Sequence, residues 1–280
     1  MSDISGGVPI ELIQWPQLPA PYAEALRAAV ADVLAHYTPT GMIAGGSVLR
    51  GEGGPTSDID LYVIQPAHFR QRLQRIYHGV PFEIFINHPD KIRAYFREEH
   101  ATRPITAHIF VTGAVLLDRA PVVQELRLEA AKWLATPPNP SVDTLRWRRY
   151  LAVDTLDNAR DVMGTDPTTA RMLLYRVLDQ LIEIRFLSAN QHLPRTKGML
   201  AALHTLDRDL ADDVVQFAAT ESLAEQFELV ADQALRIANA QGFFVWDSQV
   251  EIVNSEGDDS GITRMPRIAR SAGCLPSARR

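Results

Sequence analysis

Two aspartates separated by one residue are the first feature of this sequence with the types and spacing for chemistry. Asp58 and Asp60 begin an apolar run, 59–64, whose composition predicts a strand. Side chains two apart in a strand share a face, so both carboxylates lie together while the apolar residues pack on the other side. Adjacent carboxylates repel, which favours a hard divalent cation such as Mg²⁺ as their partner. Two such ions ~3.5–4 Å apart promote in-line phosphoryl displacement.

A cluster of glycines precedes these aspartates, because six of the sixteen glycines fall between residues 41 and 54. Within it, Gly46-Ser47 follows a short apolar segment, 42–44, that we expect to be a buried strand. Glycine lets a backbone approach phosphate closely, and backbone N–H groups with the Ser47 hydroxyl can hold phosphate oxygens. The segment lacks the Gly-Lys-Ser/Thr end of a Walker loop and the Gly-x-Gly-x-x-Gly of a dinucleotide fold, which argues against both classes.

The combined pattern resembles the signature of the polymerase-β-like nucleotidyltransferase superfamily. The residues that carry the resemblance are Gly46, Ser47, then, after ten residues, Asp58, Ile59 and Asp60. The fuller string, Gly-Ser-x-x-Arg-Gly…Ser-Asp-Ile-Asp-Leu, is similar to small bacterial members of that superfamily. Aminoglycoside adenylyltransferases among them add a C-terminal helical domain, and the resemblance in motif and domain order spans about residues 20–245.

The resemblance implies an enzyme that transfers a nucleoside monophosphate, expected to be AMP from ATP, to a hydroxyl of a small polar acceptor and releases pyrophosphate. It also implies a third carboxylate on a neighbouring strand, and Glu83 fits as a metal ligand or as the base for the acceptor hydroxyl. Asp58, Asp60 and Glu83 are therefore the expected catalytic residues and the ligands of two Mg²⁺ ions. Gly46 and Ser47 are expected to hold the β- and γ-phosphates.

Three further residues are candidates for nucleotide binding, each with a plainer alternative. Ser57 contacts the nucleotide or caps a local turn. Arg50 holds phosphate or forms a structural salt bridge. Related enzymes place a basic residue of the helical domain on the triphosphate, and Lys197, one of three lysines, is the candidate here; a solvated charge at a helix start is the alternative.

For several other polar residues, a structural role explains the sequence better than a functional one. Asp179 and Glu183, four apart on a predicted helix, could receive a cationic acceptor or supply a base, but a solvated stripe explains them better. His108 is expected in an apolar strand, as a core or cleft residue. The run Arg146 to Arg149 is expected on a surface helix.

The composition of the chain excludes several classes of protein. The 280 residues are 46% apolar and carry a net charge of −6, which indicates a globular protein and argues against general nucleic-acid binding. The single cysteine, Cys274, excludes an internal disulfide and a cysteine-based zinc site. The sequence has no signal-peptide pattern and no apolar run long enough to span a membrane, so we expect a cytoplasmic protein with no membrane partner.

The candidate residues must be positioned by helices and strands. The order of these elements in the sequence predicts an α/β (α+β) domain with a small mixed sheet, followed by an all-α helical bundle. In the first half we expect strands at 42–44, 59–64, 80–86 and 107–117, with a break near Gly113 as the alternative for the last, and helices at 19–37, 67–77 and 88–99. In the second half we expect helices that begin near Ser141, Asp166, Pro194, Asp207 and Ser222.

The expected domain boundaries follow from this order. Residues 1–18 are an N-terminal extension, 19–119 the nucleotidyltransferase domain, 120–245 the helical domain, and 246–280 a largely disordered tail. Two alternative functions stay open: a protein adenylyltransferase of toxin–antitoxin type, which the fused helical half disfavours, and a nucleotide-binding module without catalysis, which the intact acidic residues disfavour.

Overall fold

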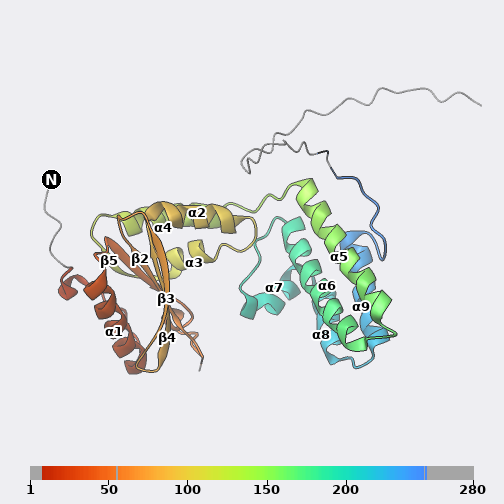
Figure 1. Cartoon of the computed structure of the whole chain (residues 1–280), viewed down its shortest axis with the longest axis horizontal. Coiled ribbons are helices and arrows are strands. Elements are labelled where there is room, and N and C mark those ends of the chain that lie inside the picture. Colours follow the sequence, from red (N-terminus) through yellow and green to blue (C-terminus); the bar gives the residue numbers. More distant parts are fainter. Residues whose placement is uncertain (1–7, 55, 249, 251–280) are drawn as a thin grey trace, which may run out of the picture. The chain divides into compact units, whose positions relative to one another are not determined.

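A computed structural model describes residues 8–54, 56–248 and 250 of the chain. Five strands form one mixed sheet in the order β3-β4-β2-β1-β5, followed in the chain by a run of helices (Figure 1). The strands are β1 (Gly41–Gly45), β2 (Ile59–Ile64), β3 (Arg70–Tyr77), β4 (Val80–Asn87) and β5 (Ala114–Asp118). The fold class predicted from the sequence is confirmed.

The helices account for most of the remaining chain. Short 3-10 segments are η1 (Ile10–Leu12), η2 (Val48–Arg50) and η3 (Thr196–Gly198). The α-helices are α1 (Ala20–His36), α2 (Pro89–His100), α3 (Ile105–Thr112), α4 (Val122–Ala135), α5 (Val142–Val162), α6 (Pro167–Ser188), α7 (Met199–Leu206), α8 (Arg208–Ala219) and α9 (Leu223–Ala238).

The centre of the sheet is the parallel pair β2 and β4, and the other strand pairs are antiparallel. β2 coincides with the predicted strand 59–64, and β4 extends the predicted 80–86 by one residue. β2 is buried on both faces apart from the partly exposed Asp60, which explains its nearly continuous apolar sequence. β4 is buried on the face of Phe82, Ile84 and Ile86, but on its other face Pro81 is exposed and Glu83 and Phe85 are only partly buried. The sheet register brings together the acidic residues of the two strands.

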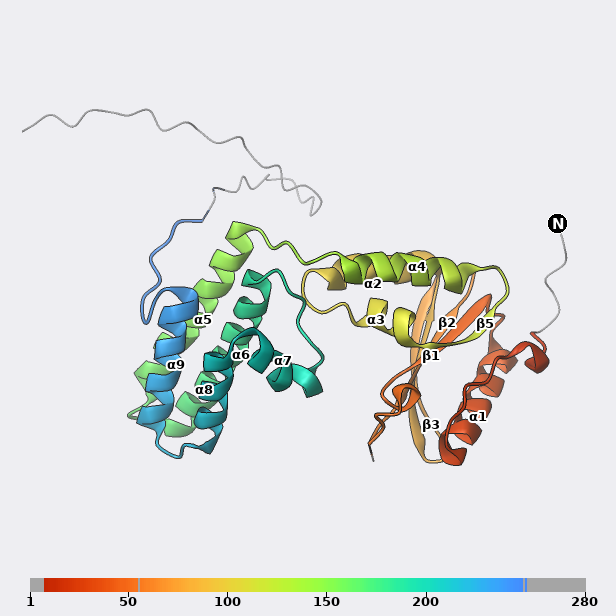
Figure 2. The same ribbon diagram turned by 180° about the vertical axis from the view of Figure 1, so that it is seen from behind.

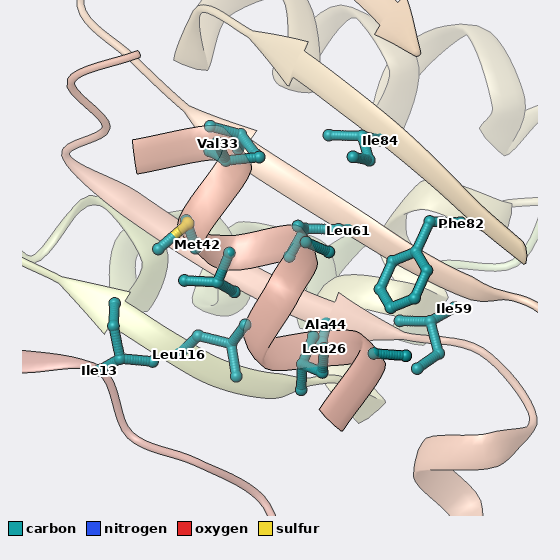
Figure 3. Close-up of a cluster of buried hydrophobic side chains, with 14 of the residues drawn as sticks. Ile13, Leu26, Val33, Met42, Ala44, Ile59, Leu61, Phe82, Ile84 and Leu116 are labelled. Atoms are coloured by element: carbon teal, nitrogen blue, oxygen red, sulfur yellow. The ribbon is translucent and has the colours of Figure 1, made fainter. Parts of the chain in front are cut away.

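One face of the sheet packs on α1. The alternate residues Ile59, Leu61 and Val63 of β2 point to this face, as the period of two predicts, and all three are fully buried. Figure 3 shows β2 and β4 side chains meeting Leu26 and Val33 of α1. The segment before α1 also contributes, because Ile13 is buried in the same cluster.

The opposite face packs on α2, α3 and α4, which lie together on one side of the sheet (Figure 2). Tyr62 of β2 is at the centre of this second core, stacked on Phe85 and edge-on to Phe110 of α3. Helix α4 buries Val123 and Leu126 against the same cluster, so the apolar layer on this face continues to α4. The two cores hold β2 and β4 rigidly from both sides.

The helix expected over 67–77 is wrong, because this segment forms the edge strand β3. Leu73, Ile76 and Tyr77 follow a helical spacing, but in the strand only Leu73 and Tyr77 pack on the core, and Ile76 is 74% exposed. A two-residue turn, His78-Gly79, joins β3 to β4, and both turn residues have positive φ. This hairpin turn determines the strand pairing that side-chain spacing did not reveal.

The strand expected over 107–117 is wrong as far as Thr112, which belongs to α3, and right from Ala114, where β5 begins after the expected break near Gly113. Residues of α3 are apolar on nearly every side because the helix is packed between the sheet and α4. An apolar run of this kind does not distinguish a buried helix from a buried strand. His108 consequently lies on a helix and not in a strand, although it remains partly buried as expected.

The helical half begins as predicted, with Ser141 and Asp166 capping the first turns of α5 and α6. A third cap, Asp207, accepts the backbone N–H of Leu210 at the start of α8. Asp207 is buried and also pairs with Arg185 of α6 and Arg236 of α9. Although burial opposes it, these hydrogen bonds lower the pKa of Asp207 to about 2. One charged network therefore links α6, α8 and α9.

Residues up to Phe243 belong to one compact unit, within which both the sheet and α5–α9 fall. The predicted tail, 246–280, lies almost entirely outside the described residues. Across the part of the chain that the structure describes, none of the helices combines the length and apolar character needed to cross a membrane.

Gly113 provides a test of the packing between α3 and β5. A Cβ atom there would lie 2.7 Å from the backbone oxygens of Ala44 and Ile109, which cannot rotate away. We expect Gly113→Ala to lower the free energy of unfolding by about 1–3 kcal/mol, measured by urea denaturation. Gly164→Ala is the matched control, since a Cβ at Gly164 meets no atom within 4 Å. Equal stabilities of the two variants would contradict this packing.

Candidate active site

The sheet register places two acidic residues and one glycine in a row across three strands, with Asp58 just before β2; Asp58, Asp60 and Glu83 are called the acidic row below. Gly45 of β1 is opposite Asp60 of β2, and Asp60 is opposite Glu83 of β4. Residues opposite each other in a sheet point to the same face, so Asp60 and Glu83 project together. This is the face covered by α3, whose Ile109 closes over Gly45. The two carboxylates predicted to act together are therefore neighbours.

The turn after β1 places Gly46 and Ser47 beside this row. Gly46 has a φ of 107°, and a Cβ there would lie 2.9 Å from the backbone oxygen of Asp58, so only glycine fits without strain. Ser47 begins the 3-10 segment η2, and its carbonyl accepts the N–H groups of Arg50 and Glu52. The predicted phosphate-binding turn and the aspartates are thus in direct backbone contact.

Ser57 connects the two parts of the motif. Its hydroxyl oxygen is buried, receives the Ser47 hydroxyl at 2.8 Å and accepts the N–H of Gly54 at 2.8 Å. The Ser57 N–H in turn donates to the carbonyl of Gly54. These contacts favour the interpretation of Ser57 as a turn residue that orients Ser47.

Asp60 has an unfavourable electrostatic environment. Burial raises the pKa of its carboxyl from the ordinary 3.8 to about 6, and the negative charges of Asp58 and Glu83 act in the same direction. Arg50 and Arg72 oppose this rise in pKa. Within the part of the chain that the structure describes, neither Asp58 nor Asp60 accepts a side-chain hydrogen bond. The pair is poised to gain a cation.

Glu83, by contrast, is already engaged by the edge strand. One guanidinium nitrogen of Arg72 lies 2.7 Å from each Glu83 oxygen, and Gln74 donates to the same carboxylate at 3.1 Å. Arg72 also lies over the ring of Phe85, 5.1 Å from its centroid. Arg72 was not among the residues predicted from the sequence, because a helix was expected over its segment. Pairing of this segment with β4 as a strand would have placed Arg72 near Glu83.

A group of basic side chains lies on the other side of the Ser47 turn. Arg50 donates to the carbonyl of Gly46 at 2.8 Å and pairs with Glu52 at 2.9 Å. Arg195, from the loop before η3, lies 3.8 Å from the same Glu52 carboxylate and 2.7 Å from the Nε2 atom of His108. Two guanidinium groups therefore share one carboxylate close to the predicted phosphate site.

Burial and neighbouring positive charges change the pKa values of His108 and Arg195. Burial lowers the pKa of His108, and the positive charges of Arg195 and Arg50 lower it further. A neutral His108 accepts the Arg195 hydrogen bond at Nε2. Burial and the neighbouring Arg50 also lower the pKa of Arg195, which is the expected response of a cation beside another cation. The single Glu52 carboxylate does not balance two guanidinium charges, so a further anion here would relieve the remaining repulsion.

Among the described residues, no hydrogen bond or ion pair joins the remaining predicted residues to the acidic row. Lys197 is exposed in η3, two residues beyond Arg195, and its role stays a prediction. Glu183 pairs with Arg148 at 2.6 Å, whereas Asp179 is exposed on the same helix. Arg195 was passed over in the sequence in favour of Lys197, and only its contacts distinguish the two.

The donor set of the acidic row suits magnesium. Asp58, Asp60 and Glu83 offer only carboxylate oxygens, the ligands that hard divalent ions prefer. The two carboxylates without hydrogen-bond partners provide the unneutralised charge that such an ion requires. The residues therefore fit the predicted metal, with Glu83 sharing its carboxylate between that site and Arg72.

A protein-family model matches the part of the chain that carries the acidic residues. Residues 26–110, which include β1, β2 and β4 with the Ser47 turn, match the family model described as "Nucleotidyltransferase domain". Residues 26–110 therefore carry a nucleotidyltransferase domain of the polymerase-β-like superfamily, and this domain supports a transferase enzyme. This confirms the superfamily indicated by the sequence motif.

A solved structure of a nucleotidyltransferase-like protein from Exiguobacterium sibiricum is similar to this chain. The two are 13% identical, and the match covers 77% of this chain and 73% of the other, with a TM-score of 0.48. No curated protein matches the chain.

The raised pKa of Asp60 predicts a distinct pH dependence of stability. Because the folded-state pKa exceeds the unfolded one, ionisation of Asp60 destabilises the folded protein above pH 6, and this penalty disappears as the pH falls through 6 to below 4. The difference between pKa values of 3.8 and about 6 corresponds to about 3 kcal/mol.

We therefore expect Asp60→Asn to be more stable than the parent chain by up to about 3 kcal/mol at pH 8 in the absence of metal. Urea denaturation at a series of pH values should show this advantage shrinking between pH 6 and 4. Asp209→Asn, an exposed change in α8, serves as control. A pH-independent difference would mean that Asp60 has an ordinary pKa.

Proposed function

We propose that this enzyme transfers a nucleoside monophosphate, AMP from ATP, to a hydroxyl group of a small polar acceptor of the aminoglycoside type. The observation that supports it best is the row of Asp60 and Glu83, joined by Asp58, directly beside the Gly46-Ser47 turn. Carboxylates able to hold Mg²⁺ and a turn able to hold phosphate oxygens are the two parts that nucleotidyl transfer requires. The AMP donor and the acceptor class rest on the resemblance.

The residues of the chain would divide the reaction as follows. Gly46 and Ser47 bind the β- and γ-phosphates through backbone N–H groups and the Ser47 hydroxyl, which Ser57 keeps oriented. Asp58, Asp60 and Glu83 would hold Mg²⁺. When bound, the metal would neutralise phosphate charge and polarise the α-phosphate. Most of the rate then comes from positioning and charge neutralisation.

Besides holding Mg²⁺, Glu83 would act as the base for the acceptor hydroxyl. The acceptor oxygen forms a bond to the α-phosphorus, the bond from that phosphorus to the bridging oxygen breaks, and pyrophosphate leaves with the bond electrons. The proton of the acceptor hydroxyl passes to Glu83. Arg72 fixes the orientation of the Glu83 carboxylate through both of its oxygens. A carboxylate held in this way is available at one edge to an incoming hydroxyl.

Arg50 and Arg195 would complete the triphosphate site. Both lie at Glu52, next to the Ser47 turn, and their mutual repulsion favours an anion between them. Planar guanidinium groups bind phosphate oxygens in pairs, which suits a leaving pyrophosphate. Lys197 remains a second candidate, since it follows Arg195 in the same exposed segment.

The acidic residues are tested by label transfer. With α-³²P-labelled nucleotides, Mg²⁺ and a panel of aminoglycosides and other hydroxylated metabolites, the parent should label an acceptor. We expect Asp58→Asn and Asp60→Asn to reduce this transfer by about 100- to 1,000-fold or more, because both remove charge that the reaction requires. Asp209→Asn should transfer label like the parent. Undiminished transfer by Asp60→Asn would refute the metal assignment, and labelling of a protein alone would favour the protein adenylyltransferase.

The basic group is tested by steady-state kinetics. Loss of a charged hydrogen bond to phosphate should raise KM for the triphosphate about 10- to 100-fold in Arg195→Ala, with a smaller effect on kcat. Lys197→Ala, two residues away and also exposed, tests the rival candidate, and Arg208→Ala, an exposed arginine of α8, is the control. If Lys197→Ala raises KM more than Arg195→Ala does, then Lys197 is the triphosphate residue.

A further inference from the structure

A second cluster of metal-ligating side chains lies at the opposite end of β2 and β4 from the acidic row. His68 belongs to the connection that follows β2, and His88 and Asp90 begin α2, which follows β4. One ligand atom from each of these three residues lies within 4.8 Å of the other two. Because β2 and β4 are parallel, their carboxyl ends bring the two connections together, while Asp60 and Glu83 occupy the starts.

The backbone holds these connections in a fixed relation. The pairing of β2 with β4 runs to Ile64 and Asn87, and the N–H of Gln65 donates to the carbonyl of Asn87 at 3.1 Å. His88, the next residue, is the N-cap of α2, and its side-chain exposure is 18%. The cluster is therefore anchored on secondary structure on the His88 side, which limits the freedom of its ligand atoms.

The three side chains already contact one another. The rings of His68 and His88 stack with centroids 3.9 Å apart and planes at 29°. The Nδ1 atom of His88 lies 3.3 Å from a carboxylate oxygen of Asp90 and accepts the Asp90 N–H at 3.2 Å. Arg93 lies 3.4 Å from the other Asp90 oxygen, but it pairs more closely with Glu129, at 2.9 Å. One oxygen of Asp90 thus remains directed at the histidines.

We propose that His68, His88 and Asp90 bind a divalent transition-metal ion of the zinc class. Two imidazoles and one carboxylate are ligands typical of Zn²⁺, whereas the all-oxygen acidic row suits Mg²⁺. Zinc bonds of ~2.0–2.2 Å in a tetrahedron place ligand atoms roughly 3.3–3.5 Å apart, so the cluster has to contract only modestly. Rotation of the exposed His68 side chain can supply that contraction.

Binding of this ion would join the segment between β2 and β3 to the start of α2. The ion is held by the folded chain and not by the unfolded one, so it stabilises the protein. A fourth coordination position is left to water, since three ligands come from the described residues. This site is independent of the proposed function, because it lies away from Asp60 and uses other donors.

The test is zinc titration of the full chain by calorimetry after treatment with a chelator. We expect one zinc ion per chain to bind even when Asp58→Asn and Asp60→Asn together have removed two of the three carboxylates of the acidic row. His68→Ala should weaken this binding by more than the roughly 10–100-fold that loss of an outer-shell partner causes. His36→Ala is the matched control, since it removes an exposed histidine from α1. Zinc should also raise the thermal unfolding temperature of the parent and not that of His68→Ala.

A second variant removes a ligand without removing the side chain that caps α2. His88→Asn removes an imidazole ligand and keeps a side chain that caps helices well, so it should fold and still lose the zinc site. Cobalt in place of zinc should give the intense visible absorption of a four-coordinate site in the parent and not in these variants. The proposal is overturned if His68→Ala binds zinc like the parent, or if zinc binding disappears with the two aspartates.

Discussion

The placement of like charges at the start of β2 is the constraint on which the rest of the structure depends. Asp60 is held partly buried beside two other carboxylates, and its raised pKa reports a free-energy cost in the absence of a cation. Such an arrangement persists only if the surrounding structure is rigid enough to resist relaxation. The two apolar cores on either side of β2 and β4 provide that rigidity, since β2 is buried on both faces and β4 packs Ile84 and Ile86 into one core and Phe85 against the other.

The fold around β2 and its two aspartates could be predicted from the sequence, because several neighbouring features of the sequence all indicate the same structure. The apolar run, the two aspartates and the glycine turn each indicate the same arrangement, and β2 has its predicted bounds. Prediction failed where one pattern fits two structures. The spacing of Leu73 and Tyr77 suits a helix face as well as an edge strand, and the apolar segment of α3 suits a helix as well as a strand.

The site was predictable only where its residues are close in sequence. Gly46, Ser47, Asp58 and Asp60 share one segment, and Glu83 follows from strand order. Arg72 and Arg195 enter through tertiary structure, because a hairpin and a distant loop bring them in. A single sequence does not reveal such contacts, and it offered Lys197 on the rarity of lysine alone. Composition marks a residue as unusual, but it does not determine its partners.

The position of β3 at the edge of the sheet has a consequence for association between molecules. An edge strand presents unpaired backbone groups that can recruit a strand from another chain. The side chains of β3 include three arginines and two glutamines, and most of the strand is exposed. Arginines on an exposed edge oppose such pairing through charge and desolvation. Arg72 thereby combines two duties, since the guanidinium that orients Glu83 also discourages the sheet from extending into a neighbouring molecule.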